Sequence, residues 1–284
     1  MLTEDNYDGI IAKHYKQVAQ EEGDKPTSTM ADIITREKET HAIDNFVSAS
    51  LKKRKTENKE DPTMIIDIGC GNGYTLEVLA AKYPKEKFIG VEITKELREI
   101  ASLRLKNFKN VSIINGDIRD INFSAGQTAD VLICQRVIIN LLDEEDQRKA
   151  LKNIIGTVRK NNSKESGGTL LFLEAFSSSL NKLNQAREEF DLAPIKPAHH
   201  NLYLEDNFFQ VPELEEFITN DFSIPENFLS AHYYITRVLH SMLIKDKPLK
   251  RNSEFVNFFT NALKDNTGDY SPLKLHMFQV SKTT

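Results

Sequence analysis

The chain has 284 residues, of which 39% are hydrophobic, enough to build a sizeable core in one large domain with an elaboration. A formal net charge of -5 and a sequence pI of about 5.9 argue against a nucleic-acid binder, which would carry a basic surface. No basic-then-apolar leader opens the chain and no run of about 18 apolar residues occurs in it. We therefore expect a cytoplasmic protein with no nucleic-acid and no membrane partner.

Two helices are predicted before residue 61. Apolar side chains recur at helical spacing from Tyr7 to Glu21, and again from about Met30 to Leu51. Between them, residues 23–29 contain a glycine and a proline, which interrupt a helix. Residues 1–60 are therefore expected to form a helical segment outside the sheet.

One nine-residue stretch, I-I-D-I-G-C-G-N-G, is the most informative part of the chain. Its apolar residues around Asp67 predict a buried parallel strand. Gly69, Gly71 and Gly73 follow at alternate positions, where a sharp turn or a closely approaching ligand requires glycine. A helical pattern occupies residues 74–83. Strand, glycine turn and helix in this order predict the first half of a nucleotide-binding βαβ unit.

The glycine spacing distinguishes between the nucleotides. The dinucleotide fingerprint G-x-G-x-x-G would need a glycine where this chain has Tyr74. The pattern D-x-G-x-G-x-G instead resembles motif I of the class I S-adenosylmethionine (SAM) methyltransferases, and the resemblance covers roughly residues 64–175. It implies that the turn passes under the methionine part of SAM; a sharp turn without a ligand is the alternative. The residues expected at this part of SAM are Asp67, Gly69, Cys70, Gly71 and Gly73.

The ends of three further predicted strands carry residues that the resemblance assigns to the same site. Glu92, followed by Ile93, ends the second strand and is expected to accept hydrogen bonds from the ribose hydroxyls. Asp117 and Ile118 follow the third strand and are expected at the adenine amino group and ring. Gln135 ends the fourth strand and is expected to face the transferred methyl group. A solvated helix-capping acid remains the alternative for Glu92, and an Asx turn the alternative for Asp117.

The second half of the chain departs from a minimal α/β fold. A fifth strand is predicted at residues 168–174, and residues 177–210 then form an insertion that is the natural substrate cap. Within the insertion we expect a helix at residues 180–190 and an extended loop at residues 194–203, because proline disfavours helix at the residue before it.

Four elements are expected after the cap. They are a helix at 211–220, a strand at 228–243, a helix at 253–263 and a strand at 273–280. Pattern alone predicts an α/β fold. The resemblance implies a Rossmann-like, seven-stranded, mostly parallel sheet with helices on both faces and an antiparallel last strand. It also implies a lid made by residues 1–60 over a methyltransferase domain at residues 61–284.

Candidate residues for the acceptor side lie in the lid, the cap and the loop after the fourth strand. Tyr7, Tyr15 and Arg36 on the lid are expected to reach the SAM carboxylate or the substrate. Histidine is the usual base near neutral pH, so His199 or His200 is the predicted base; two exposed loop histidines are the alternative. Other residues expected at the reaction centre or the acceptor are Arg136, Asn140, Arg187, Asn201 and Tyr203.

No metal site is predicted, because no Cys or His spacing matches a zinc motif. Metal-dependent catechol-type methyltransferases carry an Asp after the fourth strand and an Asp-Asn pair after the next. This chain has Gln135-Arg136 and Glu174-Ala175 there, and the departure argues against that subclass. The resemblance, which extends to bacterial surface-glycan and secondary-metabolite enzymes, implies methyl transfer to a hydroxyl of a small polar metabolite such as a sugar or glycan-linked group. N-methylation of an amino sugar or amine, and a SAM-binding protein without catalysis, are the alternatives. The oligomeric state stays open, with a homodimer as one possibility.

Overall fold

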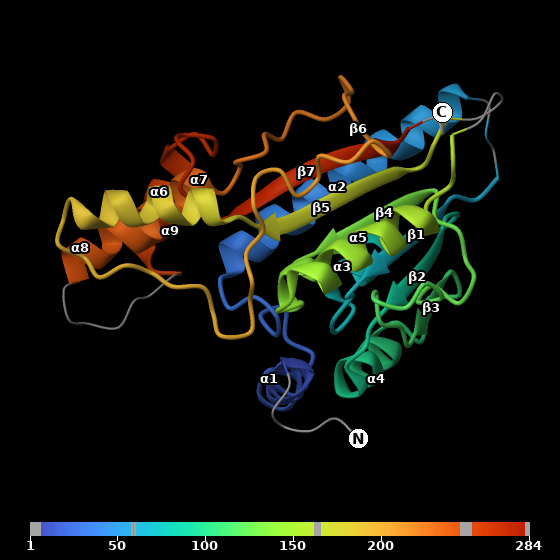
Figure 1. Ribbon diagram of the computed structural model, residues 1–284, viewed down its shortest axis with the longest axis horizontal. Coiled ribbons are helices and arrows are strands. Elements are labelled where there is room, and N and C mark those ends of the chain that lie inside the picture. The colour runs from blue at the N-terminus through green and yellow to red at the C-terminus, as the bar shows by residue number, and fades with distance from the viewer. Residues whose placement is uncertain (1–6, 58, 60, 162–165, 245–251, 282–284) are drawn as a thin grey trace.

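The computed structural model describes residues 7–57, 59, 61–161, 166–244 and 252–281, and within them seven strands form one sheet. The strands are β1 (Met64–Ile68), β2 (Lys87–Val91), β3 (Val111–Ile114), β4 (Val131–Gln135), β5 (Thr169–Ala175), β6 (Leu214–Glu216) and β7 (Leu273–Val280). Their spatial order is β3-β2-β1-β4-β5-β7-β6 (Figure 1). The first five strands are parallel, and β7 runs antiparallel to both of its neighbours. The predicted seven-stranded, mostly parallel, Rossmann-like sheet is confirmed.

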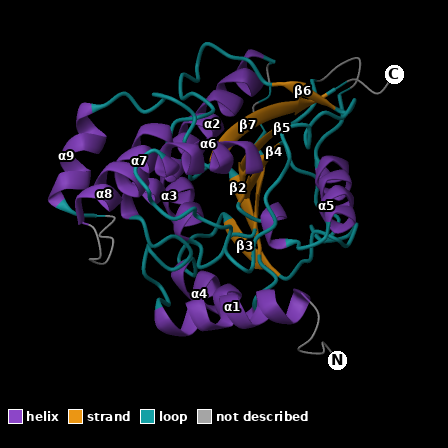
Figure 2. Ribbon diagram, turned by 60° about the vertical axis from the view of Figure 1, so that its left-hand side comes forward, coloured by secondary structure: helices purple, strands orange, loops and turns teal. Residues whose placement is uncertain are grey.

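Helices cover both faces of the sheet (Figure 2). The central strands β1, β4 and β5 are therefore almost wholly buried, which is why their sequences are continuous apolar runs rather than alternating ones. The α-helices are α1 (Tyr7–Glu21), α2 (Ile33–Thr56), α3 (Tyr74–Lys82), α4 (Lys95–Arg104), α5 (Glu144–Thr157), α6 (Ser177–Glu188), α7 (Ser230–Tyr234), α8 (His240–Ile244) and α9 (Glu254–Ala262). A 3₁₀ turn, η1 (Ile138–Asn140), follows β4, and a π-helical segment, η2 (Ile235–Leu239), joins α7 to α8.

The two N-terminal helices are placed differently. α2 packs on the sheet: its Phe46 is fully buried, and Ser50 Oγ lies 2.8 Å from Thr169 Oγ1 on β5. α1 lies away from the sheet and beside α4 (Figure 1), and Ala19 is its one buried residue. α1 therefore has little apolar burial to hold it, and polar contacts become important for its position. None of the helices described by the structure is long and apolar enough to cross a membrane.

Two predicted elements are wrong. Residues 228–243 do not form a strand but the continuous helical run α7–η2–α8. Their aromatic and β-branched residues favour a strand, yet the buried Ala231, Ile235 and Val238 lie at i, i+4 and i+7, the spacing of one helical face. Residues 211–220 do not form a helix; they contain the short edge strand β6, and Ile218 in this segment is 84% exposed. The sixth strand thus precedes the C-terminal helices.

Candidate active site

A cavity of about 370 Å³ lies at the carboxyl ends of the parallel strands, where open α/β sheets bind their ligands. Its walls are the loops after β1, β2, β3 and β4, together with residues of α1 and α2. The predicted cofactor residues that line it are Tyr15, Asp67, Gly69, Cys70, Gly71, Glu92, Ile93, Asp117, Ile118 and Gln135. Gly73 is outside the lining and caps the N-terminus of α3. Nine residues from the ends of four strands, together with Tyr15 of α1, therefore surround one space.

The turn after β1 explains the glycine spacing. Gly69, Gly71 and Gly73 have φ angles of 63°, 55° and 79°, a region that other residues rarely adopt. Space is a second constraint, since a Cβ on Gly69 would lie 2.4 Å from Cγ2 of Val137. Both constraints hold without any ligand, but the result is a turn whose backbone forms part of the cavity wall.

Glu92 is fixed at the end of β2 by backbone amides. Its Oε2 accepts a hydrogen bond from Gly71 N at 2.9 Å, and its Oε1 accepts one from Thr94 N at 2.7 Å. A carboxylate has about four acceptor positions, so about two remain for hydroxyl donors in the cavity. Burial raises the pKa of Glu92, and burial together with the Glu92 charge raises the pKa of Asp67 to about 7. The two remaining acceptor positions of Glu92 suit a ribose, which has two hydroxyl groups to donate.

Arg36 provides a positive charge beside the glycine turn. Its Nε donates to Pro26 O at 3.1 Å, and its guanidinium also donates to the Thr29 hydroxyl. Burial lowers the pKa of Arg36 to about 10, so the side chain stays charged at neutral pH. Because Arg36 lines the same cavity, it is suitably placed for a ligand carboxylate near the turn.

Asp117 is not free in the structure but paired with Arg119, a residue that sequence reasoning missed. Arg119 Nη2 lies 2.6 Å from Asp117 Oδ2, and Arg119 Nη1 lies 2.8 Å from Asp8 Oδ1 and 2.9 Å from the Tyr7 hydroxyl. The Tyr7 hydroxyl in turn donates to Asp146 on α5. Burial alone would raise the pKa of Asp117, but hydrogen bonds and charge from Arg119 hold it below its usual range. Arg119 thus ties the start of α1 to the part of the cavity lined by Asp117.

Replacing Arg119 with alanine is expected to weaken SAM binding about fivefold, equivalent to about 1 kcal/mol, the scale of a partly exposed ion-pair network. The reason is that α1 loses its link to Asp117 and spends more time away from the cavity. Calorimetric titration with SAM and amide hydrogen exchange across α1 measure both effects. Lys152→Ala, which removes an exposed cation from α5, is the control and should change neither; equal behaviour of the two variants would contradict the role of Arg119.

A second part of the cavity wall is built around Arg136. It has a φ of 56°, a left-handed conformation that is uncommon outside glycine and often marks a functional site. Its guanidinium forms an ion pair with Glu39 of α2, whose side chain is fully buried, and Gln135 Nε2 donates to the same carboxylate at 2.8 Å. Sequence reasoning missed Glu39, because an acid in the middle of a helix is normally solvated.

Asn140 connects this wall to α1. Its Nδ2 donates to Arg136 O at 2.8 Å and to the Tyr15 hydroxyl at 2.9 Å. Burial raises the pKa of Tyr15 to about 12, so the hydroxyl stays protonated and remains a donor at neutral pH. Tyr15, Arg136 and Asn140 therefore form one polar cluster at the cavity wall.

The predicted cap residues do not line this cavity. Arg187 donates hydrogen bonds to the carbonyls of Ala193 and Arg237, and so links the cap loop to η2. The backbone N–H of Asn201 donates to Ala198 O within the cap loop. Tyr203 is largely enclosed, and this burial raises the pKa of its hydroxyl to about 12. The remaining two cap residues, His199 and His200, lie against the ring of His14 on α1, and the His200 ring is also edge-on to Tyr15.

The strand order, the glycine turn and the carboxylate at the end of β2 are those of the class I SAM-dependent methyltransferases. Residues 65–161 match a family described as a methyltransferase domain.

Curated relatives and a solved structure agree with this assignment. The malonyl-[acyl-carrier protein] O-methyltransferase of Bacillus cereus is 24% identical over 68% of this chain and 67% of that protein. The enzyme of the same name from Halalkalibacterium halodurans is 28% identical over 31% of this chain; the match spans only 33% of that protein's length. The N-methyltransferase NodS from Bradyrhizobium japonicum, solved with S-adenosylhomocysteine, aligns with 96% of this chain and 99% of its own at 14% identity and a TM-score of 0.54, a likeness of fold.

Proposed function

We propose that the protein transfers the methyl group of SAM to an oxygen atom of a small polar metabolite, with a hydroxyl of a sugar or glycan-linked group as the leading acceptor. The observation that carries the proposal is one cavity lined by two sets of residues. The glycine turn and Glu92, the donor end of the lining, suit SAM. The polar cluster of Tyr15, Arg136 and Asn140, the acceptor end, suits a polar acceptor.

The donor end would be held by residues with separate tasks. Glu92 would bind the ribose hydroxyls, Arg36 the methionine carboxylate, and Ile118 would pack against the adenine ring. SAM supplies an electrophilic methyl group when bound. The chain's contribution is to hold donor and acceptor in line, and such positioning can lower a barrier by several kcal/mol, with about 7–11 as the upper range.

The acceptor end favours oxygen chemistry for a polar substrate. Arg136 is fixed by Glu39, whose carboxylate also accepts from Gln135, and the other guanidinium hydrogens of Arg136 remain as donors toward an acceptor oxygen. A hydroxyl acceptor must also lose its proton to a base. A carboxylate acceptor needs no base, and it is the second candidate because two arginines, Arg36 and Arg136, line the cavity. The names of the malonyl-[acyl-carrier protein] relatives support an oxygen acceptor, whereas the name of NodS keeps the amine alternative in view.

The test uses SAM labelled in the methyl group and a metabolite extract as the acceptor pool. We expect label to pass into a small polar product. Treatment with alkali then separates the chemistries: a methyl ester releases volatile labelled methanol, whereas a methyl ether and an N-methyl amine keep the label and are distinguished by mass spectrometry. SAM binding with no transfer to any acceptor would instead support a non-catalytic SAM-binding protein.

The predicted histidine base has its own test. If the acceptor is a hydroxyl and His199 or His200 takes its proton, one of the two alanine variants should lose roughly a hundredfold in turnover while SAM affinity is kept. Turnover at the normal rate in both variants would place the base elsewhere.

A further inference from the structure

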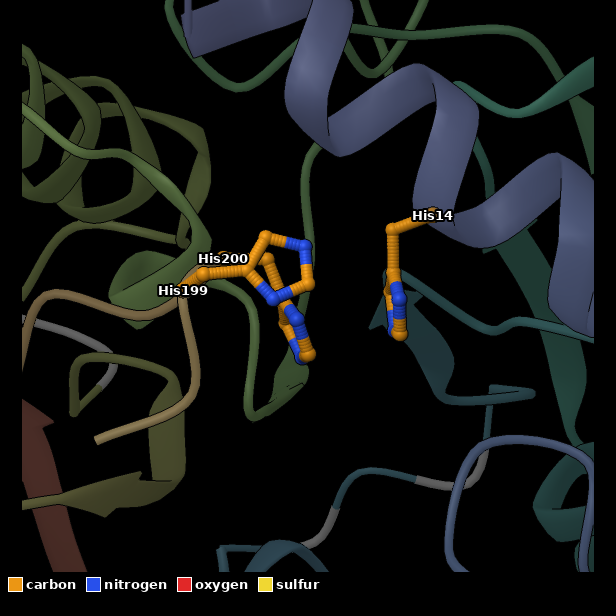
Figure 3. A group of neighbouring side chains, drawn as sticks. All are labelled: His14, His199 and His200. Atoms are coloured by element: carbon orange, nitrogen blue, oxygen red, sulfur yellow. The ribbon is translucent and has the colours of Figure 1, made fainter. Parts of the chain in front are cut away.

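Three histidines that are far apart in the sequence meet at the contact between α1 and the cap. His14 projects from α1, and His199 and His200 project toward it from the loop after α6 (Figure 3). One ring nitrogen from each residue lies within 4.8 Å of the others. The rings of His14 and His200 are stacked with centroids 3.6 Å apart, and the His199 ring is edge-on to both.

The surroundings of the cluster do not account for it as ordinary packing. His200 Nδ1 is buried and has no hydrogen-bond partner, a costly arrangement for a polar atom. The groups that perturb His14 and His200 electrostatically are the other histidines of the cluster, and no carboxylate is among them. Burial is the main cause that lowers the pKa of both residues, that of His200 to about 4, so both rings are neutral near neutral pH. Neutral imidazole is the form that binds a metal ion.

We propose that His14, His199 and His200 together bind one divalent transition-metal ion of the zinc class. Three imidazoles with a fourth position left to water or substrate are an established zinc ligand set. His199 is exposed, so the fourth position would face solvent or an incoming ligand. At zinc–nitrogen distances of about 2.1 Å, tetrahedral geometry places ligand nitrogens about 3.4 Å apart. To reach this spacing, the stacked rings of His14 and His200 would have to tilt so that their lone pairs converge on the ion.

The position of the cluster gives the ion a definite effect, which is to fasten α1 to the cap. α1 is held mainly by polar contacts, and Tyr15, the residue after His14, lines the cavity and bonds Asn140. An ion that bridges His14 to the cap loop would hold Tyr15 in place and keep α1 over the cavity. A ring nitrogen bound to metal cannot also accept a substrate proton, so this role competes with the predicted base role of His199 and His200.

The first measurement is metal binding to the untagged chain after treatment with a chelator, with no SAM present. Titration with Co²⁺ should give the intense visible absorption of a tetrahedral complex at one ion per chain, and Zn²⁺ should displace it. His14→Ala, His199→Ala and His200→Ala should each weaken binding by about a hundredfold or more, the upper range reported even for residues that only support the ligands. His41→Ala, which removes an exposed histidine from α2, should bind the ion as the wild type does.

The second measurement tests the bridge itself. Zn²⁺ should slow amide hydrogen exchange across α1 in the wild type and leave it unchanged in His14→Ala and in the milder His14→Gln. Absence of stoichiometric binding in the wild type, or wild-type affinity in both His14 variants, would overturn the proposal. Because neither measurement uses SAM or an acceptor, the outcome is independent of whether the proposed methyl transfer is correct.

Discussion

Replacing Glu92 with alanine is expected to lower the affinity for SAM at least tenfold, equivalent to about 1.4 kcal/mol or more. Hydrogen bonds to a charged acceptor contribute about 1.5–3 kcal/mol each, and two ribose hydroxyls would lose theirs. Glu92 is only 6% exposed and is held by Gly71 N and Thr94 N, so its carboxylate is already oriented before the ligand arrives. Loss of this carboxylate therefore removes both the charge and the preorganisation.

Calorimetric titration with SAM and with S-adenosylhomocysteine measures the loss directly, and circular dichroism checks that the variant is folded. Glu99→Ala is the matched control, because it removes an exposed acid from the neighbouring helix α4 without touching the cavity lining. We expect the control to bind both ligands as the wild type does. Unchanged affinity in a folded Glu92→Ala protein would remove Glu92 from the ribose-binding role.

The donor side of the site was predictable because its chemistry is local in the sequence. Gly69 and Gly71 need positive φ angles, and the turn that they form is encoded within a few residues. Glu92 stands directly after β2 and Asp117 three residues after the end of β3, and parallel strands bring such ends to one edge of the sheet. Spacing and residue type therefore carry enough information to gather these groups before any tertiary contact is known.

The acceptor side and the position of α1 depend on contacts between distant segments, and the sequence does not encode these by spacing. Glu39 meets Arg136 across 97 positions, and Arg119 meets Tyr7 across 112. His14 on α1 gave no sign that it would stack on His200. The helical run that includes Ile235 was predicted as a strand for a related reason: residue preference favours a strand, whereas packing of one helical face decides the structure.

Replacing Glu174 with glutamine is expected to reduce the free energy of unfolding by about 1–3 kcal/mol, the cost of leaving a buried donor unpaired. Glu174 is fully buried at the end of β5, and its Oε1 accepts from Val137 N at 2.9 Å and Ile138 N at 3.0 Å, while Oε2 accepts from Ile139 N at 3.3 Å. Glutamine would turn an N–H₂ group toward one of these amides. The same loop carries Arg136 in its left-handed conformation, so methyl transfer should fall as well. Urea denaturation measures the change, with the exposed Glu215→Gln as the control.

The dependence of this effect on pH follows from the state of the carboxyl group. Burial raises the pKa of Glu174 from 4.5 to about 7, so the folded chain holds this proton more tightly than the unfolded chain does. Its contribution to stability is therefore greatest below about pH 4.5 and is lost as the pH rises to about 7. Glutamine does not titrate, so the stability difference between wild type and Glu174→Gln should be wide near pH 5 and narrower near pH 8. A difference that stays constant or widens over this range would mean that Glu174 is already ionised at pH 5, with its three amide hydrogen bonds outweighing the cost of burial.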